Sequence, residues 1–396
     1  MKNDYHIEID SLYAKESITK LEFPKTPTIS SITCYIQQVV HGQLNSPAID
    51  DWADLYTAGL DSLQTASIAN MLNKAINGGN PNSEALITAQ MVYDHPTISA
   101  LSHFINRFLH GSRLEMAISR TAKINDVLKT YTHALPEQKA LSISRDTCRK
   151  HVVLLTGSTG SLGTYILNVL LDDPSVAKIY CLNRSEGAEE NQMKSHHKRG
   201  LRVWHLNDDR IEFVHAVFGE DHLGLSDTTY YRLLNTVDII VHNAWDVNFN
   251  RSLTSFQPLI KGAYDLFDIS RRGRFRPHFF FVSSISTIQN WNISMGGRSA
   301  PEDPIQSPDA VAHQGYAESK HVVERLCYHM SSVARVPTTI LRVGQIAGPS
   351  LCMGNWNRSE WLPALVETSR SLRKLPSHLG NANNIDWIPV VSHSLD

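Results

Sequence analysis

The chain has 396 residues, which is long for one domain and suits two, and its composition of 42% hydrophobic and 19% charged residues is ordinary for a soluble globular protein. Its formal net charge of −2 gives no indication of nucleic acid or an anionic membrane as partner, and no apolar run approaches a membrane span. The N-terminus lacks a secretory signal, and the five cysteines lack metal-ligand or disulfide spacing. We therefore predict a cytoplasmic protein without a structural metal.

The first patterned region is a small helical bundle. Prolines and hydroxyl residues end a tail at 1–27, and the following residues predict helices at 31–44, 62–76 and 97–109. We interpret 28–110 as one small all-α domain. Residues 111–149 show no strong period and are interpreted as a linker with some helix.

This bundle is more acidic than the rest of the chain. Residues 28–110 contain six acidic and two basic side chains, a net charge of −4 within a chain of −2. An acidic small domain suits a mobile donor that visits basic docking surfaces. A merely solvated acidic face is the alternative.

Short apolar runs alternate with longer amphipathic segments from residue 150 onward. The runs lie at 152–156, 178–182, 211–217, 237–242, 278–283 and 338–343. This alternation is typical of parallel strands joined by crossover helices. It predicts an α/β domain at 150–396 with a Rossmann-like, doubly wound parallel sheet.

Ser62 begins the second predicted helix, within the string Gly59-Leu60-Asp61-Ser62-Leu63. A phosphodiester on its hydroxyl would lie where the helix N–H groups and the macrodipole favour an anion. A simple N-cap role for Ser62 is the alternative.

A glycine-rich turn joins the first predicted strand to a helix. Glycines allow the tight turn and let the backbone approach a pyrophosphate at the helix N-terminus. We predict that the dinucleotide contacts are Gly157, Ser158, Thr159, Gly160, Ser161, Leu162 and Gly163. At the end of the second strand stands Arg184, which suits the 2′-phosphate of NADPH, with a plain surface arginine as the alternative.

Tyr316 and Lys320 are four residues apart and therefore share a helix face. We expect the ammonium to lower the pKa of Tyr316 and so make it a general acid towards a carbonyl oxygen that receives hydride. Ser283 and Ser284 end the fifth predicted strand, where a hydroxyl can donate to the same oxyanion.

Residues 31–110 resemble acyl or peptidyl carrier domains. The resemblance rests on the string around Ser62 and on 92–98, VYDHPTI, which is similar to the YxxPTI lead into the last carrier helix. It implies 4′-phosphopantetheine on Ser62, attached by a phosphopantetheinyl transferase, with a small acyl substrate held as a thioester.

The glycine turn, the serine-ended strand and YxxxK resemble, in this order, the extended short-chain dehydrogenase/reductase family. The resemblance selects Ser284 as the catalytic hydroxyl beside Tyr316 and Lys320, leaves Ser283 structural, and adds Asn243, Tyr316 and Lys320 to the cofactor-binding residues. Strings at 241–250, 341–348, 356–361 and 386–390 look like the thioester reductase domain of fungal adenylation-carrier-reductase enzymes, kin to alpha-aminoadipate reductase and carboxylic acid reductases. The tail at 4–13 is similar to the stretch after their adenylation domain.

The resemblance implies a carrier-linked, NADPH-dependent oxidoreductase of secondary metabolism. It would release a thioester-bound acyl group as an aldehyde, or after a second reduction as an alcohol. Candidates for the wall of the acyl pocket are Trp245, Phe249 and Trp361, with ordinary core packing as the alternative.

Two departures from the family affect this expectation. The sequence shows no adenylation domain, so we expect an acyl-loading adenylation or synthase protein in trans, or a longer parent chain. It also stops shortly after 386–390, where the family continues into a substrate-binding subdomain. One alternative is therefore a carrier module with an inactive, truncated reductase. Another is a reductase of a free aldehyde, ketone or nucleotide sugar. The fusion to a carrier argues against it, because a tethered arm supplies substrate at high effective concentration and makes a free one unnecessary.

Overall fold

The computed structural model describes residues 23–24, 26–44, 49–76, 87–110, 113–132, 149–249, 251–350, 356–358, 360–379 and 387–390. The tail segment at 4–13 and Asp386 of the last family string lie outside the described residues. The chain forms two compact units, the first made of residues 1–123 and 248–252 and the second of residues 124–247 and 253–396, and each is described by itself.

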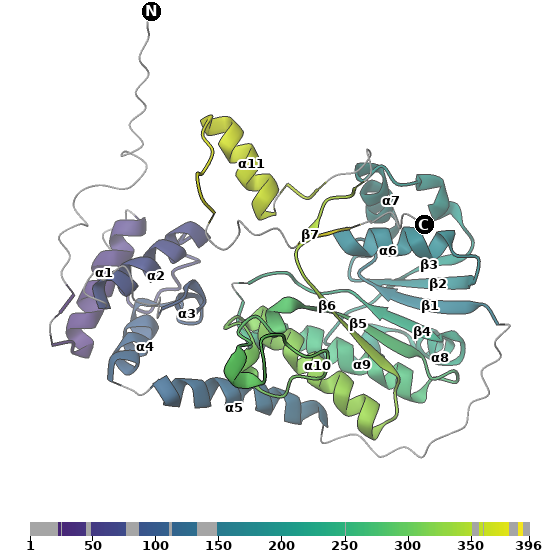
Figure 1. The fold of residues 1–396 in the computed structure, drawn as a ribbon, viewed down its shortest axis with the longest axis horizontal. Coiled ribbons are helices and arrows are strands. Elements are labelled where there is room, and N and C mark those ends of the chain that lie inside the picture. Colours follow the sequence, from purple (N-terminus) through teal and green to yellow (C-terminus); the bar gives the residue numbers. More distant parts are fainter. Residues whose placement is uncertain are drawn as a thin grey trace, which may run out of the picture. The chain divides into compact units, whose positions relative to one another are not determined.

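The first unit is a helical bundle (Figure 1). It contains α1 (Ile29–Leu44), α2 (Ser62–Ile76), α3 (Ala89–Tyr93) and α4 (Ile98–His110). The sequence predicted three of these helices, but α3 is too short for a periodic apolar pattern to show. The bundle buries its own apolar core, which includes Ile32, Ile36, Leu55, Ile68, Leu72, Val92, Leu101 and Ile105.

The loop that leads to Ser62 contacts the segment that joins α3 to α4. The Leu55 N–H donates to the Pro96 carbonyl at 2.8 Å. The Tyr56 ring stacks on Tyr93 with their centroids 4.8 Å apart. The loop before α2 is therefore held by a main-chain and an aromatic contact to the segment between the end of α3 and the start of α4.

The segment predicted as a linker contains a long helix, α5 (Arg113–Thr132). Ile124 is fully buried in the core of the second unit, and Val127, Leu128 and Tyr131 pack against it. Their i, i+3, i+4, i+7 spacing is the signal of an amphipathic helix. The second half of α5 is thus a packed part of the second unit.

The second unit is built on a six-stranded parallel sheet in the order β3-β2-β1-β4-β5-β6 (Figure 1). The strands are β1 (His151–Thr156), β2 (Val176–Asn183), β3 (Ile211–His215), β4 (Ile239–His242), β5 (His278–Ser284) and β6 (Thr338–Val343). The predicted doubly wound sheet is confirmed. Its strand order reverses between β1 and β4, and ligands of such sheets bind at the carboxyl ends of the strands at this switch point.

Helices cover both faces of the sheet because alternate residues of each strand point to opposite faces. Val153 and Leu155 of β1 share a core cluster with Leu167 of α6. Leu154 belongs instead to the cluster that contains α9 and α10 residues. The long helices are α6 (Ser161–Asp172), α7 (Ala188–Lys198), α8 (Asp227–Thr236), α9 (Gln257–Arg272), α10 (Gly315–Val333) and α11 (Trp361–Leu372).

Short elements complete the second unit. A two-stranded sheet pairs β7 (Ile346–Ala347) with β8 (Ile388–Pro389). The 3₁₀ turns are η2 (Val203–Asn207), η3 (Asp221–Gly224), η4 (Leu253–Phe256), η5 (Ile285–Thr287), η6 (Ile293–Met295) and η7 (Pro308–Ala310). Within the described part of the chain, none of the helices combines the length and the apolar composition that crossing a bilayer demands.

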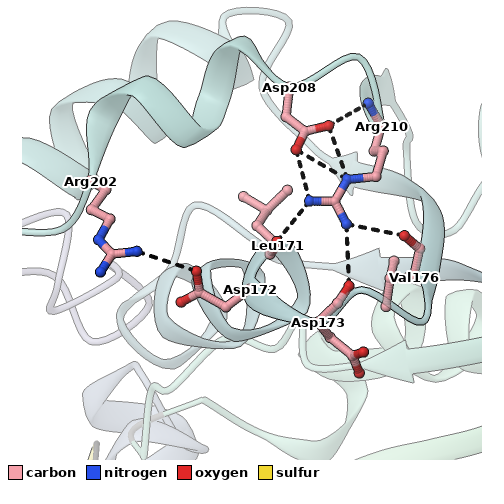
Figure 2. A network of polar contacts seen from close by, with 7 residues as sticks. All are labelled: Leu171, Asp172, Asp173, Val176, Arg202, Asp208 and Arg210. Carbon is pink, nitrogen blue, oxygen red and sulfur yellow. Dashed lines mark hydrogen bonds and ion pairs between the residues drawn. The ribbon is translucent and has the colours of Figure 1, made fainter.

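Arg210 makes a network of polar contacts at the amino-terminal ends of β2 and β3 (Figure 2). Its Nε donates to both Asp208 oxygens at 3.0 Å. Its two Nη atoms donate to the carbonyls of Leu171 at 2.7 Å, Val176 at 3.0 Å and Asp173 at 3.2 Å. One side chain therefore joins the end of α6 and the start of β2 to the start of β3.

Candidate functional site

The start of α2 is capped by Asp61. Its N–H donates to Gln64 Oε1 at 2.9 Å, and the Gln64 N–H donates back to Asp61 Oδ1 at 2.8 Å. This reciprocal pair is a capping box. The alternative that Ser62 serves only as the N-cap is not supported, because Asp61 has that role. Ser62 is instead the first residue of the helix.

The glycine turn after β1 has little room for side chains. Gly157 has φ +68°, and a Cβ on it would lie 2.8 Å from Ala244 Cα. A Cβ on Gly163 would lie 2.0 Å from the Gly157 carbonyl oxygen. Gly160 is the N-cap of α6 and makes no side-chain capping hydrogen bond. No side chain of the N-cap residue therefore competes with an anion for the first N–H groups of α6.

Thr156, the last residue of β1, connects this turn to the end of β4 through hydrogen bonds with residues 242–244. The Thr156 hydroxyl oxygen accepts from the N–H groups of Asn243 at 3.1 Å and Ala244 at 3.0 Å. Its single proton is then available to His242 Nδ1, 2.9 Å away, which must be the unprotonated nitrogen. Burial lowers the pKa of His242 to about 3, with a smaller effect of Lys320 in the same direction, so the ring is neutral at physiological pH.

Asn243, expected among the cofactor contacts, braces the glycine turn. Its Nδ2 donates to the Gly157 carbonyl at 3.2 Å. At the end of β2, the buried Asn183 donates to Ser158 Oγ at 2.9 Å and accepts from Thr159 Oγ1 at 3.4 Å. These two amide side chains therefore hold the shape of the turn.

Arg184 is exposed immediately beyond the end of β2. The carboxyl ends of parallel strands lie at one edge of the sheet, so Arg184 lies at the same edge as the glycine turn. An exposed guanidinium at this position can reach a ribose phosphate without the desolvation cost of a buried charge.

Tyr316, Lys320 and Ser284 come together at the junction of α10 and β5. Tyr316 is 8% exposed and hydrogen-bonds Ser284. Lys320 is 2% exposed, and its Nζ donates to the Val282 carbonyl at 2.6 Å. The ammonium also lies 5.9 Å from the centroid of the Tyr316 ring. The phenol, the ammonium and the strand-end hydroxyl therefore form one cluster.

The two serines at the end of β5 have different partners. Ser284 Oγ accepts from the Ser286 N–H at 3.2 Å and from Ser286 Oγ at 3.0 Å, which leaves its own proton for another acceptor. Ser283 is 3% exposed and donates to the buried carboxylate of Glu324. This difference supports a catalytic role for Ser284 and a structural one for Ser283.

The expected effect of Lys320 on Tyr316 is wrong. Burial raises the pKa of Tyr316, and the opposing effect comes from the hydrogen bond with Ser284. Burial also lowers the pKa of Lys320 well below its usual value. Desolvation disfavours the charged forms of both groups, and this outweighs the stabilisation of the phenolate that the i, i+4 spacing led us to expect.

Sequence reasoning missed Glu324 and Arg342. Glu324 is 2% exposed and accepts from Arg342 Nη2 at 2.7 Å. The signal for Glu324 was its position four residues after Lys320, on the same face of the helix. Arg342 gave no such signal, because its partner lies on a different element.

The three aromatic candidates for the acyl pocket differ in burial. Trp245 is partly buried in the core, and its Nε1 donates to Ser319 Oγ at 3.2 Å. Lys320 Nζ lies 4.3 Å from the centroid of the Trp245 ring. Trp245 therefore packs as a core residue beneath the cluster. Phe249 and Trp361 are 50% and 40% exposed.

The bundle, the doubly wound sheet and the cluster beside the glycine turn define a carrier domain joined to a Rossmann-like NAD(P)-binding reductase. A family model described as male sterility protein, an NAD-binding domain, matches residues 155–392, and one described as phosphopantetheine attachment site matches residues 34–105. The chain belongs to this male sterility family of reductase domains, in the carrier–reductase arrangement of fungal adenylate-forming reductases. The predicted cofactor classes, NAD(P)H and phosphopantetheine, are thereby confirmed.

Relatives and solved structures agree with this assignment. The chain is 34% identical to a carboxylic acid reductase of Neurospora crassa over 98% of its own length and 37% of that protein. It is 30% identical to the adenylate-forming reductase Nps11 of Serpula lacrymans, over 97% of this chain and 36% of that protein. The chain thus spans little more than a third of these relatives.

Among solved structures, the terminal R domain of the myxalamid PKS-NRPS pathway matches with TM-score 0.56 and 28% identity, over 68% of this chain and 66% of that one. A thiolation-reductase di-domain of an archaeal non-ribosomal peptide synthetase matches with TM-score 0.55 and 17% identity, over 83% and 66%. Because its sequence identity is only 17%, the second match is evidence for a shared fold and for nothing further.

Proposed function

We propose that this chain reduces an acyl thioester held on a phosphopantetheine arm at Ser62 and releases the acyl group as an aldehyde, with NADPH as reductant. The observation that carries the proposal is the cluster of Ser284, Tyr316 and Lys320 at the sheet edge that also bears the glycine turn. An arm on the first residue of α2 would present substrates covalently.

The residues present fit a dinucleotide. The uncapped start of α6 suits a pyrophosphate, because N–H groups and the macrodipole favour an anion there. Arg184 suits the 2′-phosphate that distinguishes NADPH from NADH. When bound, NADPH supplies the hydride that reduces the thioester carbonyl carbon.

The chain itself supplies the proton and the oxygen-binding groups. Tyr316, whose pKa is raised by burial, remains protonated at neutral pH and can donate to the carbonyl oxygen. Ser284 donates a hydrogen bond to the same oxygen, because both lone pairs of its hydroxyl are taken by Ser286. Hydride and proton addition give a hemithioacetal. The hemithioacetal hydroxyl then loses its proton as the C–S bond breaks, and the sulfur, which stays on the arm, takes up a proton to become a thiol while the aldehyde leaves.

The carrier domain implies two classes of partner enzyme. A phosphopantetheinyl transferase must modify Ser62, and an acyl-loading adenylation or synthase activity must charge the arm. The relatives named adenylate-forming reductases support loading by adenylation.

The test is NADPH oxidation by the purified full chain given a panel of acyl-pantetheine thioesters, with the product trapped as an aldehyde derivative. We expect turnover in the wild type and a loss of about 100-fold or more in Tyr316→Phe, because the variant keeps the ring but lacks the general acid. Equal turnover by Tyr316→Phe would contradict the assigned acid.

A second comparison separates tethered from free substrates. Ser62→Ala should abolish reduction of acyl groups loaded onto the chain and leave reduction of free acyl-pantetheine unchanged. Activity confined to free aldehydes or ketones, with no thioester reduced, would show that the chain is a reductase of another class.

A further inference from the structure

Glu324 is a buried carboxylate whose partners flank the proposed catalytic serine. It accepts from Ser283 Oγ, which precedes Ser284, and from Thr287 Oγ1 at 2.9 Å. The Thr287 hydroxyl also lies 2.9 Å from the Ser284 carbonyl oxygen. One carboxylate therefore holds both ends of the turn that carries the Ser284 hydroxyl.

Arg342 compensates the charge of Glu324. Its Nε lies 3.0 Å and its Nη2 2.7 Å from Glu324 Oε2. The same guanidinium donates to the carbonyls of Pro301 at 3.2 Å and Asp303 at 3.4 Å. All partners of the carboxylate in the described structure are donors, which suits an ionised and fully satisfied buried acid.

Glu324 also lies on the same face of α10 as two of the proposed catalytic groups. Tyr316, Lys320 and Glu324 follow one another at four-residue spacing on α10 and so share one face. Each contacts one of three consecutive residues of β5, at 282–284. Tyr316 bonds Ser284, Lys320 bonds the Val282 carbonyl and Glu324 bonds Ser283.

We propose that Glu324 is a positioning residue of the reductase, which holds the end of β5 so that the Ser284 hydroxyl faces Tyr316. The proposal rests on the proposed function and adds to it a residue outside the Ser-Tyr-Lys set. Glu324 acts through Ser283 and Thr287 and does not itself touch the substrate.

A second consequence concerns Lys320. Its charged or titratable neighbours among the described residues are Tyr316 and Glu324 on the same helix and His242 at the end of β4. His242 is neutral, so Glu324 is the neighbour that favours the ammonium, and it is itself paired with Arg342. Removing the carboxylate charge should lower the pKa of Lys320 further, so that Lys320 loses its proton at a lower pH.

The test compares Glu324→Gln with Asp265→Asn, a matched control. Asp265 is also a buried carboxylate, 7% exposed, but it pairs with Lys261 on α9 at 2.9 Å, away from the catalytic turn. Both changes replace a carboxylate by an amide of similar shape. Steady-state kinetics, the pH profile of kcat and hydrogen–deuterium exchange are measured on the full chain.

For Glu324→Gln we expect kcat on acyl-pantetheine to fall about 10- to 100-fold with little change in the KM for NADPH, because a misplaced hydroxyl weakens the chemical step. The alkaline limb of its kcat profile should move to lower pH. Amides at 282–287 should exchange faster. Asp265→Asn should show none of these three changes.

The proposal would be overturned if, in Glu324→Gln, the amides at 282–287 exchanged at the wild-type rate and kcat and its pH profile were unchanged. Equal losses in both variants would overturn it too, since they would reflect general destabilisation. If the wild type reduces no thioester, the proposed function is wrong, but this result alone does not test the role of Glu324. The exchange comparison then still decides whether Glu324 holds the turn.

Discussion

At the scale of the residue, burial determines how the ionisable groups of this site behave. Tyr316 has its pKa raised and Lys320 has its pKa lowered by loss of water, although their spacing suggested mutual stabilisation. His242 follows the same rule, because the folded protein keeps its ring neutral between aromatic side chains. For all three groups, loss of water is the largest cause of the pKa shift, and it favours the neutral form.

His242 should make the second unit sensitive to acid. Its pKa is about 3 in the folded protein and near 6.5 when unfolded, so below pH 6.5 only the unfolded state takes up the proton. Stability should therefore fall as the pH drops from 6.5 towards 3, by about 2 kcal/mol between pH 6.5 and 5. Full stability is retained above pH 6.5.

Denaturant unfolding at both pH values checks this, with His242→Asn for comparison. The amide oxygen can still accept the Thr156 proton but cannot titrate. The variant should lose about 2 kcal/mol less than the wild type over this interval. The same pH dependence in both proteins would show that other groups cause the acid sensitivity.

At the scale of the element, single side chains join helices to strands far along the sequence. Arg210 links the end of α6 and the start of β2 to β3, as Figure 2 shows. Arg210→Met should destabilise the second unit by about 3 kcal/mol, because it leaves Asp208 and three carbonyls without their shared donor.

Thermal or urea unfolding measures this cost, and Arg202→Met is the matched control. Arg202 pairs with Asp172 at 3.5 Å, but their side chains are 59% and 51% exposed. An exposed pair of this kind contributes under about 1 kcal/mol. If both variants lost the same stability, the Arg210 network would have no special role at the amino-terminal ends of β2 and β3.

At the scale of the whole molecule, the two units have separate hydrophobic cores. We expect two unfolding transitions. Leu72→Ala, at a fully buried position of the bundle, should lower the stability of the first unit by about 2–5 kcal/mol and leave the second transition unchanged. Differential scanning calorimetry distinguishes this from a single cooperative transition that shifts as a whole.

The sequence by itself determined the parts of the structure that local chemistry specifies. Alternating apolar runs predicted all six strands of the sheet, and the glycines of 157–163 predicted a turn that admits no side chain at Gly157 or Gly163. The YxxxK spacing placed Tyr316 and Lys320 on one face of α10. These features depend on residues close together in the chain, so their patterns can be read directly.

Only the tertiary structure decided the contacts between distant elements. Arg342 meets Glu324 across 18 residues, and His242 meets Thr156 across 86. The pKa directions of Tyr316 and Lys320 were likewise decided by burial. Desolvation and hydrogen bonding depend on which groups the fold brings together, and sequence spacing carries no measure of either.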